Sequence, residues 1–162
     1  MQLAIFAIAA APGYLIAAAT IDRIGRKSIQ MVGFVMMAVA FGAIAMIPHI
    51  DKLVLPFLII YGVSYFFTEF GPNSTTFVYP AEIFPVRART TGHGIAAATG
   101  KFGGFCGVFL FPIFMAWHGL LAAEGATAVA SVLGAIVTLT MLPETKGMSL
   151  EELSPEEASA AA

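Results

Sequence analysis

Polar side chains recur at helical spacing within one long apolar stretch of the sequence. Tyr61, Tyr65, Glu69 and Asn73 follow one another at intervals of four, and Thr76 comes three residues later. Residues three or four apart share one face of an α-helix. Lipid would penalise such a stripe of phenol, carboxyl, amide and hydroxyl groups, so we expect it to face a water-filled path or a binding cavity. The alternative is hydrogen bonding between helices, without a ligand.

Two ionisable side chains, Glu69 and Lys101, interrupt otherwise apolar segments. A charge inside a bilayer costs roughly 2.5–3.5 kcal/mol on insertion scales and marks a functional candidate. A carboxyl in a site of low dielectric constant can exchange a proton near neutral pH, so Glu69 is a candidate for proton coupling. Lys101 offers a point charge for an anion, and Asn73 can donate and accept hydrogen bonds. We predict that Asn73, Lys101, Tyr65 and Thr76 bind a solute.

Opposite charges gather at two of the turns between apolar segments. Opposite charges on neighbouring helix ends can pair, and a pair that forms in one conformation only would latch that conformation. The predicted gate consists of six side chains, which are Asp22, Arg23 and Arg26 from the first turn and Glu82, Arg87 and Arg89 from the second. The alternative is that these charges only set the orientation of the chain in the membrane.

Five apolar segments must position these side chains. They cover approximately residues 3–21, 29–47, 53–79, 94–117 and 120–142. Each is long enough to cross a bilayer as a helix, and the third should kink at Gly71-Pro72. The apolar stretches are continuous rather than alternating, which argues against a β-barrel. The predicted fold is an all-α membrane protein with five transmembrane helices.

The composition excludes several classes of protein. Of the 162 residues, 59% are hydrophobic and 11% are charged, and the mean hydropathy is +0.87. A soluble domain carries about 25% charged residues, so an ordinary soluble enzyme is excluded. Eight Lys and Arg against ten Asp and Glu leave no basic field for nucleic acid. His49, His93 and His118 lack metal-ligand spacing. We therefore expect no catalytic residue, no metal and no cofactor.

Basic residues fall on one side of the predicted bundle. The turns after the first and third segments, together with the tail, hold six Lys and Arg, whereas the opposite turns hold only Lys52. By the positive-inside rule, the basic turns and the acidic tail over residues 143–162 are cytoplasmic. The N-terminus then lies outside, and this arrangement predicts that further sequence precedes Met1.

Five runs of residues resemble motifs of the major facilitator superfamily, in the order that the superfamily has them. Residues 22–27 resemble its D-R-x-G-R-R/K motif between the second and third helices of each half. Residues 80–89 and 143–147 resemble the P-x-E-x-F-P-x-x-x-R loop and the P-E-T-K-G ending of its sugar-porter-like branch. Residues 70–77 and 91–101 resemble the narrower F-G-P-N-x-T-T-F and H-G-I-x-A-A-x-G-K signatures of phosphate:proton symporters.

The resemblance implies that the chain corresponds to helices 8 to 12 of a twelve-helix transporter, which is a C-terminal half-bundle without its first helix. It implies that Asn73 contacts phosphate and that Lys101 matters to transport. It also places the carboxylate of helix 7 and the N-terminal half of the transporter outside this chain. Glu69 stands where plant and fungal members usually carry an amide, so we expect a bacterial member in the inner membrane.

We therefore expect the C-terminal part of a proton-coupled secondary transporter for inorganic phosphate, working by alternating access. Its expected partners are phosphate or another small solute, protons, the lipid bilayer and the missing N-terminal half. A sugar or organic-acid:proton symporter is the alternative within the same class, because it shares the loop and ending motifs. A membrane protein that associates with another chain and does not transport is the alternative of another class, since five helices form only half a substrate cavity.

Overall fold

The computed structural model describes residues 6–148, and within that range it contains helices and no strand. The long helices are α2 (Ala11–Ile24), α3 (Arg26–Met46), α4 (Val54–Thr68), α5 (Ser74–Ile83) and α6 (Arg89–Met141). Short helical turns complete the chain, namely η1 (Phe6–Ala10), η2 (Ile50–Lys52) and η3 (Glu69–Asn73). The predicted all-α class is confirmed. Residues 3–5 of the first predicted segment and 149–162 of the predicted tail lie outside the described residues.

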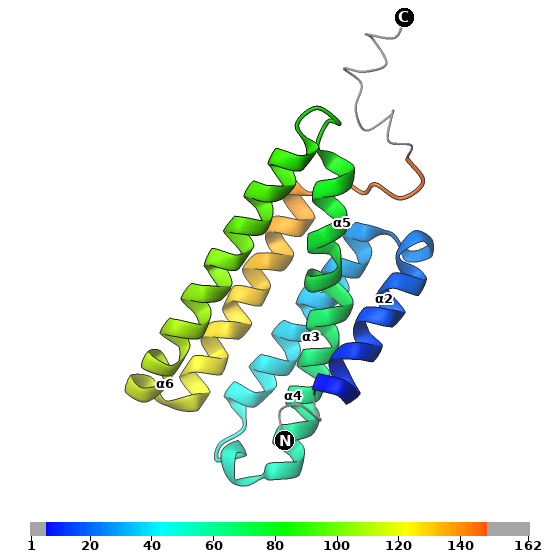
Figure 1. Cartoon of the computed structure of the whole chain (residues 1–162). Coiled ribbons are helices and arrows are strands. Elements are labelled where there is room, and N and C mark those ends of the chain that lie inside the picture. Colours follow the sequence, from blue (N-terminus) through cyan, green and yellow to red (C-terminus); the bar gives the residue numbers. More distant parts are fainter. Residues whose placement is uncertain (1–5, 149–162) are drawn as a thin grey trace, which may run out of the picture.

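Helix α6 is a hairpin of two antiparallel halves. Gly119 has φ 82° and ψ 169°, a conformation open to glycine because glycine lacks a Cβ atom, and the chain reverses there. Figure 1 shows the two halves lying side by side, before and after this turn. Within residues 6–148, four helical stretches are long and apolar enough to cross a membrane, and α6 counts as one of them despite its turn: Ala7–Ile24, Arg26–Met46, Val54–Ile83 and Arg89–Met141.

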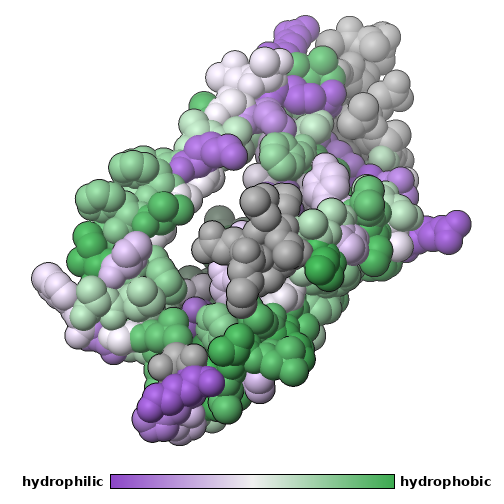
Figure 2. Space-filling view, turned by 60° about the horizontal axis from the view of Figure 1, so that its bottom comes forward, coloured by the Kyte–Doolittle hydropathy of each residue, from purple (hydrophilic) through white to green (hydrophobic). Residues whose placement is uncertain are grey.

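Apolar side chains cover the outside of the bundle as well as its interior. A small core joins α2, α3 and η3 through Ala17, Ile21, Ile29 and Phe70. Many other large apolar side chains are exposed, such as Val108, which is 80% exposed. Figure 2 shows wide hydrophobic areas, smaller hydrophilic clusters and an opening between two arms of the molecule. Water would penalise so much exposed apolar surface, whereas lipid does not.

Helix α4 continues into α5 through the π-helical turn η3, which contains Pro72. Proline lacks an N–H donor and crowds the preceding turn, and a widened π turn relieves this crowding while freeing backbone carbonyls. Hydroxyls near this interruption donate to backbone carbonyls: Ser74 donates to the carbonyl of Glu69, and Thr75 donates at 3.0 Å to that of Gly71, which also accepts from the backbone N–H of Ser74. The polar residues after Pro72 thus stabilise the interruption that proline creates.

Two glycines let α3 and η3 touch backbone to backbone. A Cβ atom added at Gly33 would lie 2.5 Å from the Cα of Gly71 and 2.6 Å from the Cδ of Pro72. Both distances are below those of real Cβ contacts, so a larger residue at either glycine would push the helices apart. This close approach fixes the position of the π turn that carries Glu69 and Asn73.

Candidate functional site

The polar stripe divides between two places. Asn73 Nδ2 donates a hydrogen bond to Glu69 Oε2 at 2.5 Å, one helical turn apart across η3. Asn73 is exposed and Glu69 is half-buried, so the pair borders the surface of the described bundle. Thr76 donates to the carbonyl of Pro72 at 2.6 Å, so its hydroxyl bonds the backbone one turn before it. The structure brings Glu69 and Asn73 together as one polar unit that holds a carboxylate beside an amide.

Lys101 lies on another helix, whereas Tyr65 stands one helical turn before Glu69 on α4, where its carbonyl accepts from the backbone N–H of Glu69. Tyr65 lines a cavity, which Glu69, Asn73, Thr76 and Lys101 do not line. Lys101 is exposed on the first half of α6, and within residues 6–148 its ammonium group makes neither a hydrogen bond nor an ion pair. The predicted solute-binding set is therefore not assembled within the described part of the chain.

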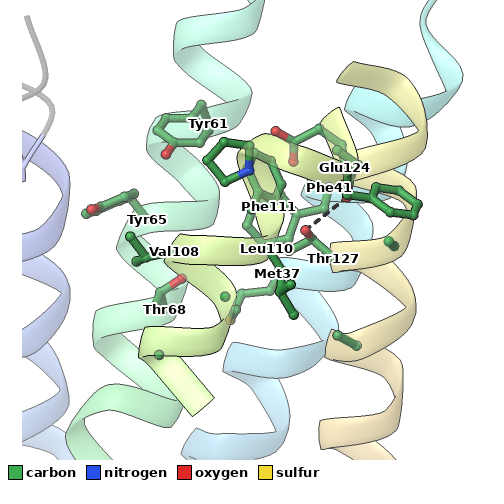
Figure 3. A pocket seen from close by; sticks show the side chains of 17 residues that line it. Met37, Phe41, Tyr61, Tyr65, Thr68, Val108, Leu110, Phe111, Glu124 and Thr127 are labelled. Carbon is green, nitrogen blue, oxygen red and sulfur yellow. Dashed lines mark hydrogen bonds between the residues drawn. The ribbon is translucent and has the colours of Figure 1, made fainter. Parts of the chain in front are cut away.

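The cavity opens between α3, α4 and both halves of α6, and its volume is about 890 Å³ (Figure 3). Its walls are mostly apolar, with Met37 from α3 and Phe111 from the first half of α6 among them. Tyr61 and Tyr65 line one side, with their ring centroids 5.7 Å apart. Glu124, from the second half of α6, lines the other side and is only 4% exposed.

Glu124 is a buried charge that the sequence reasoning missed. The prediction counted two ionisable side chains inside the apolar segments. Glu124 is a third, because it lies five residues after the Gly119 turn and therefore inside the second half of α6. Its position near the start of the predicted last segment made it resemble a residue of the connecting turn. The available signal was the run of small and apolar residues that continues on both sides of it.

Three of the six predicted gate residues meet at the end of the bundle where α2 turns into α3. Arg26 Nη2 lies 2.8 Å from Asp22 Oδ1 and 2.7 Å from Glu82 Oε1. Arg26 Nε also donates to both oxygens of Glu82, at 3.0 and 3.2 Å. The side chains of Arg26 and Glu82 are 14% and 17% exposed, so this pair is stronger than an ordinary surface ion pair.

The segment after α6 adds two residues to this cluster. The sequence analysis did not predict this contribution. Thr145 donates to Glu82 Oε2 at 2.5 Å, and Glu144 Oε1 accepts from the backbone N–H of Arg26 at 2.9 Å. Glu144 therefore caps the first turn of α3, where a carboxylate is favoured. We name Asp22, Arg26, Glu82, Glu144 and Thr145 the charge cluster. Arg26 and Glu144 lie 118 residues apart in the chain, so the sequence did not predict their contact.

The other three predicted gate residues stay outside the charge cluster. Arg23 contributes only its backbone carbonyl, which accepts a hydrogen bond from Lys146 Nζ at 2.5 Å. Arg87 is exposed, and its side chain has no hydrogen bond or ion pair among the described residues. Arg89 Nε donates to the carbonyl of Phe84 at 3.2 Å, while its Nη2 is buried without a partner in this part of the chain.

Comparisons with known proteins agree with this architecture. The family described as "Sugar (and other) transporter" matches residues 2–156. A probable inorganic phosphate transporter 1-6 of Arabidopsis thaliana is 44% identical over 148 residues, covering 90% of this chain and 28% of that protein. A putative inorganic phosphate transporter 1-13 of Oryza sativa subsp. japonica is 45% identical over 155 residues, covering 91% and 29%. The low affinity inorganic phosphate transporter 1 of Petunia hybrida is 45% identical over 163 residues, covering 90% and 30%.

The chain thus spans less than a third of the length of these relatives. The relatives are plant proteins, so the comparisons do not support the expectation of a bacterial inner membrane. The match over nearly the whole sequence, together with its apolar helices, shows that the chain is a multi-pass integral membrane protein that belongs to the sugar (and other) transporter family of the major facilitator superfamily.

Proposed function

We propose that the chain is the C-terminal part of a secondary transporter that carries inorganic phosphate together with protons by alternating access. The relatives are named as inorganic phosphate transporters, and they match about nine-tenths of the chain. The observation that carries the proposal is the Glu69–Asn73 pair on η3. A carboxyl that shares a hydrogen bond with a neighbouring amide couples the protonation of Glu69 to the donor that Asn73 can offer an anion.

In this proposal Asn73 and Lys101 contact the anion, Tyr65 and Thr76 line its path, and Glu69 takes the proton. Lys101 is free to reach an anion because its ammonium group is unpaired within the described residues. The N-terminal half of the transporter supplies the opposite wall, since the superfamily binds its substrate between two parallel halves.

The charge cluster acts as the cytoplasmic latch. Counting α6 as two spans gives five crossings, so the α2–α3 turn, the α5–α6 turn and the segment after α6 share one side. That side carries most of the basic residues, and the positive-inside rule makes it cytoplasmic. The Arg26–Glu82 pair joins α3 to α5, so breaking it frees the end of α5 during a change of conformation.

A sugar or organic-acid:proton symporter remains the second candidate, and the breadth of the matched family favours keeping it. The candidate of another class is a membrane protein that associates with another chain without transporting a solute.

The first experiment separates these candidates. The chain replaces the matching segment of the petunia relative, and labelled phosphate uptake is measured in yeast that lacks its own phosphate transporters. We expect uptake that rises at acidic external pH and that excess glucose or aromatic acids do not reduce. Phosphate uptake that sugars block would favour the second candidate. The chain alone, reconstituted in vesicles, should take up no phosphate. Phosphate uptake by the isolated chain would contradict the proposal that it is a fragment.

Asn73→Ala tests the assigned site within the same chimera. Loss of one amide contact to a buried anion should raise the phosphate concentration for half-maximal uptake about tenfold, which corresponds to roughly 1.4 kcal/mol. Thr99→Ala is the matched control, because Thr99 is also exposed and bonds only the carbonyl of Ile95. Equal phosphate dependence of both variants at equal amounts in the membrane would contradict the role of Asn73.

A further inference from the structure

One carboxyl group stands among the mostly apolar walls of the cavity. Glu124 is 4% exposed, and within residues 6–148 its side chain forms neither a hydrogen bond nor an ion pair. Figure 3 shows this side chain beside Phe111, at the end of the cavity where Tyr61 lies. An ionised carboxylate without a partner is unfavourable in such a site, so the group needs something that neutralises it.

The side chains that face Glu124 from the other helices carry no positive charge. The two α3 residues on the walls, Met37 and Phe41, are apolar. The first half of α6 contributes glycines and apolar side chains alone, and α4 contributes two tyrosines and a threonine. Among the described residues, Tyr61 and Tyr65 are therefore the titratable groups that share the walls with Glu124.

Cations elsewhere in the chain do not reach Glu124. Lys101 precedes Gly119 by 18 residues, whereas Glu124 follows it by five. At about 1.5 Å per residue, the two side chains stand roughly 20 Å apart along the hairpin. Within the described range, no ion pair joins Glu124 to the cationic or potentially cationic side chains at its own end of the bundle, which are His49, Lys52 and His118. A proton is the neutralising partner that this arrangement leaves.

Glu124 lies nearer the outer side of the membrane than Glu69 does. The Gly119 turn stands at the end of the bundle opposite the charge cluster, and the positive-inside rule makes that end the outer one. Glu124 comes five residues after this turn, whereas Glu69 comes 15 residues after α4 begins at the same end. Tyr61 and Tyr65 occupy successive turns of α4 before Glu69, with ring centroids 5.7 Å apart. The tyrosines therefore connect the level of Glu124 with that of Glu69.

We propose that Glu124 is a second proton-binding site, which takes a proton from the outer side and carries it through the transport cycle in addition to the proton on Glu69. This inference rests on the proposal that the transporter moves phosphate together with protons. In the arrangement seen here the neutral acid is the stable form, because little water reaches the carboxyl and no cation faces it. Alternating access brings water to the cavity, and the proton then passes from the carboxyl oxygen to that water.

Infrared spectroscopy tests the protonation directly. The chimera of this chain with the petunia relative is reconstituted in lipid vesicles, where a protonated acid absorbs through its C=O stretch, apart from the bands of an ionised carboxylate. At neutral pH, Glu124→Gln should remove acid absorption and leave the carboxylate bands unchanged. Glu82→Gln is the control, because Glu82 is paired with Arg26 and its loss should weaken the carboxylate bands instead. Weaker carboxylate bands in Glu124→Gln would overturn the inference, since a cation elsewhere in the transporter would then neutralise Glu124.

The equilibrium accumulation of phosphate tests whether this proton moves with the solute. Under a pH gradient of about one unit without a membrane potential, each co-transported proton raises the accumulation ratio about tenfold. Glu124→Gln cannot take up the proton, so its ratio should fall about tenfold. Thr127→Val is the matched control, because Thr127 lines the same cavity and its hydroxyl donates only to the carbonyl of Ala123. An unchanged ratio in Glu124→Gln would overturn the inference.

A second variant decides the matter where Glu124→Gln abolishes folding or uptake. Glu124→Asp keeps a carboxyl at this position, so it should retain both the acid absorption and the accumulation ratio of the unaltered chimera. Ionised carboxylate bands from this aspartate, or a ratio about tenfold lower, would contradict proton binding here.

Failure of this inference can be told apart from failure of the transport proposal. The infrared comparison needs no phosphate, so acid absorption from Glu124 in a chimera that takes up no phosphate contradicts the transport proposal and supports the proton-binding site. Phosphate uptake that rises at acidic external pH, with an unchanged accumulation ratio in Glu124→Gln, supports transport and overturns the second proton.

Discussion

Replacing Gly33 by alanine should force α3 away from η3, the π turn that carries Glu69 and Asn73. The added Cβ would lie 2.5 Å from the Cα of Gly71, about 0.9 Å short of the distance at which ordinary van der Waals contact begins. The carbonyl oxygen of Phe67 and the ring of Pro72 lie within 3.0 Å as well. These are backbone and ring atoms that cannot rotate away, so α3 and η3 must separate.

The expected net cost is about 1–2 kcal/mol. Overpacking of a close contact costs about 1–3 kcal/mol, and alanine returns about 0.5–1 kcal/mol because it favours the helix more than glycine does. The matched control is Gly42→Ala on the same helix, where a Cβ would meet no atom within 4 Å. That variant should equal or exceed the stability of the unaltered chain.

Unfolding of the chain in mixed micelles, followed by circular dichroism as the fraction of sodium dodecyl sulfate rises, gives the comparison. The Gly33→Ala midpoint should fall and the Gly42→Ala midpoint should stay or rise. If Gly33→Ala proves as stable as Gly42→Ala, the two helices do not touch through their backbones and the reasoning is refuted.

Two further substitutions test other contacts in the same unfolding assay. Glu82→Gln removes the charge that Arg26 binds, and it should lower the free energy of unfolding by about 1–3 kcal/mol. Asp22→Asn should lower it by less than about 0.5 kcal/mol, because the side chain of Asp22 is 79% exposed. Similar effects of the two variants would contradict the importance of burial. Thr75→Val removes a buried hydroxyl that donates to the carbonyl of Gly71, and it should cost about 1 kcal/mol, while Thr99→Val at an exposed site should cost little. Equal midpoints for the two threonine variants would contradict a stabilising role of the buried hydroxyl.

Hydropathy alone indicated the helices, because their apolar stretches are long and end at charged or proline-containing turns. The turn of α6 at Gly119 falls between the predicted segments 94–117 and 120–142, although only the structure shows the positive φ of this glycine. The charge cluster was half visible: Asp22, Arg26 and Glu82 stand in recognisable turns, whereas Glu144 reaches them only through the folded chain. Sequence periodicity could place a residue on a helix face but could not say what that face meets.

The same limit explains the candidate site. The four-residue spacing predicted that Glu69 and Asn73 share a face, and the structure joins them by a hydrogen bond. It also grouped Tyr65 with them, and Tyr65 does stand one helical turn before Glu69, but Tyr65 lines the cavity, which Glu69 and Asn73 do not line. The sequence shows that Glu124 stands within an apolar run, but its burial depends on how the two halves of one hairpin pack against α3 and α4.

The half of α6 before Gly119 is supported at two points, near Gly92 where the ring of Phe84 packs and at the hairpin turn itself. A helix that packs only at its two ends is free to tilt in its middle. The middle of this half is therefore less restrained than the half after Gly119, where Ala123, Ser131 and Thr138 are buried. Lys101 lies on the half before Gly119, so its exposed ammonium group belongs to the less restrained half of the hairpin.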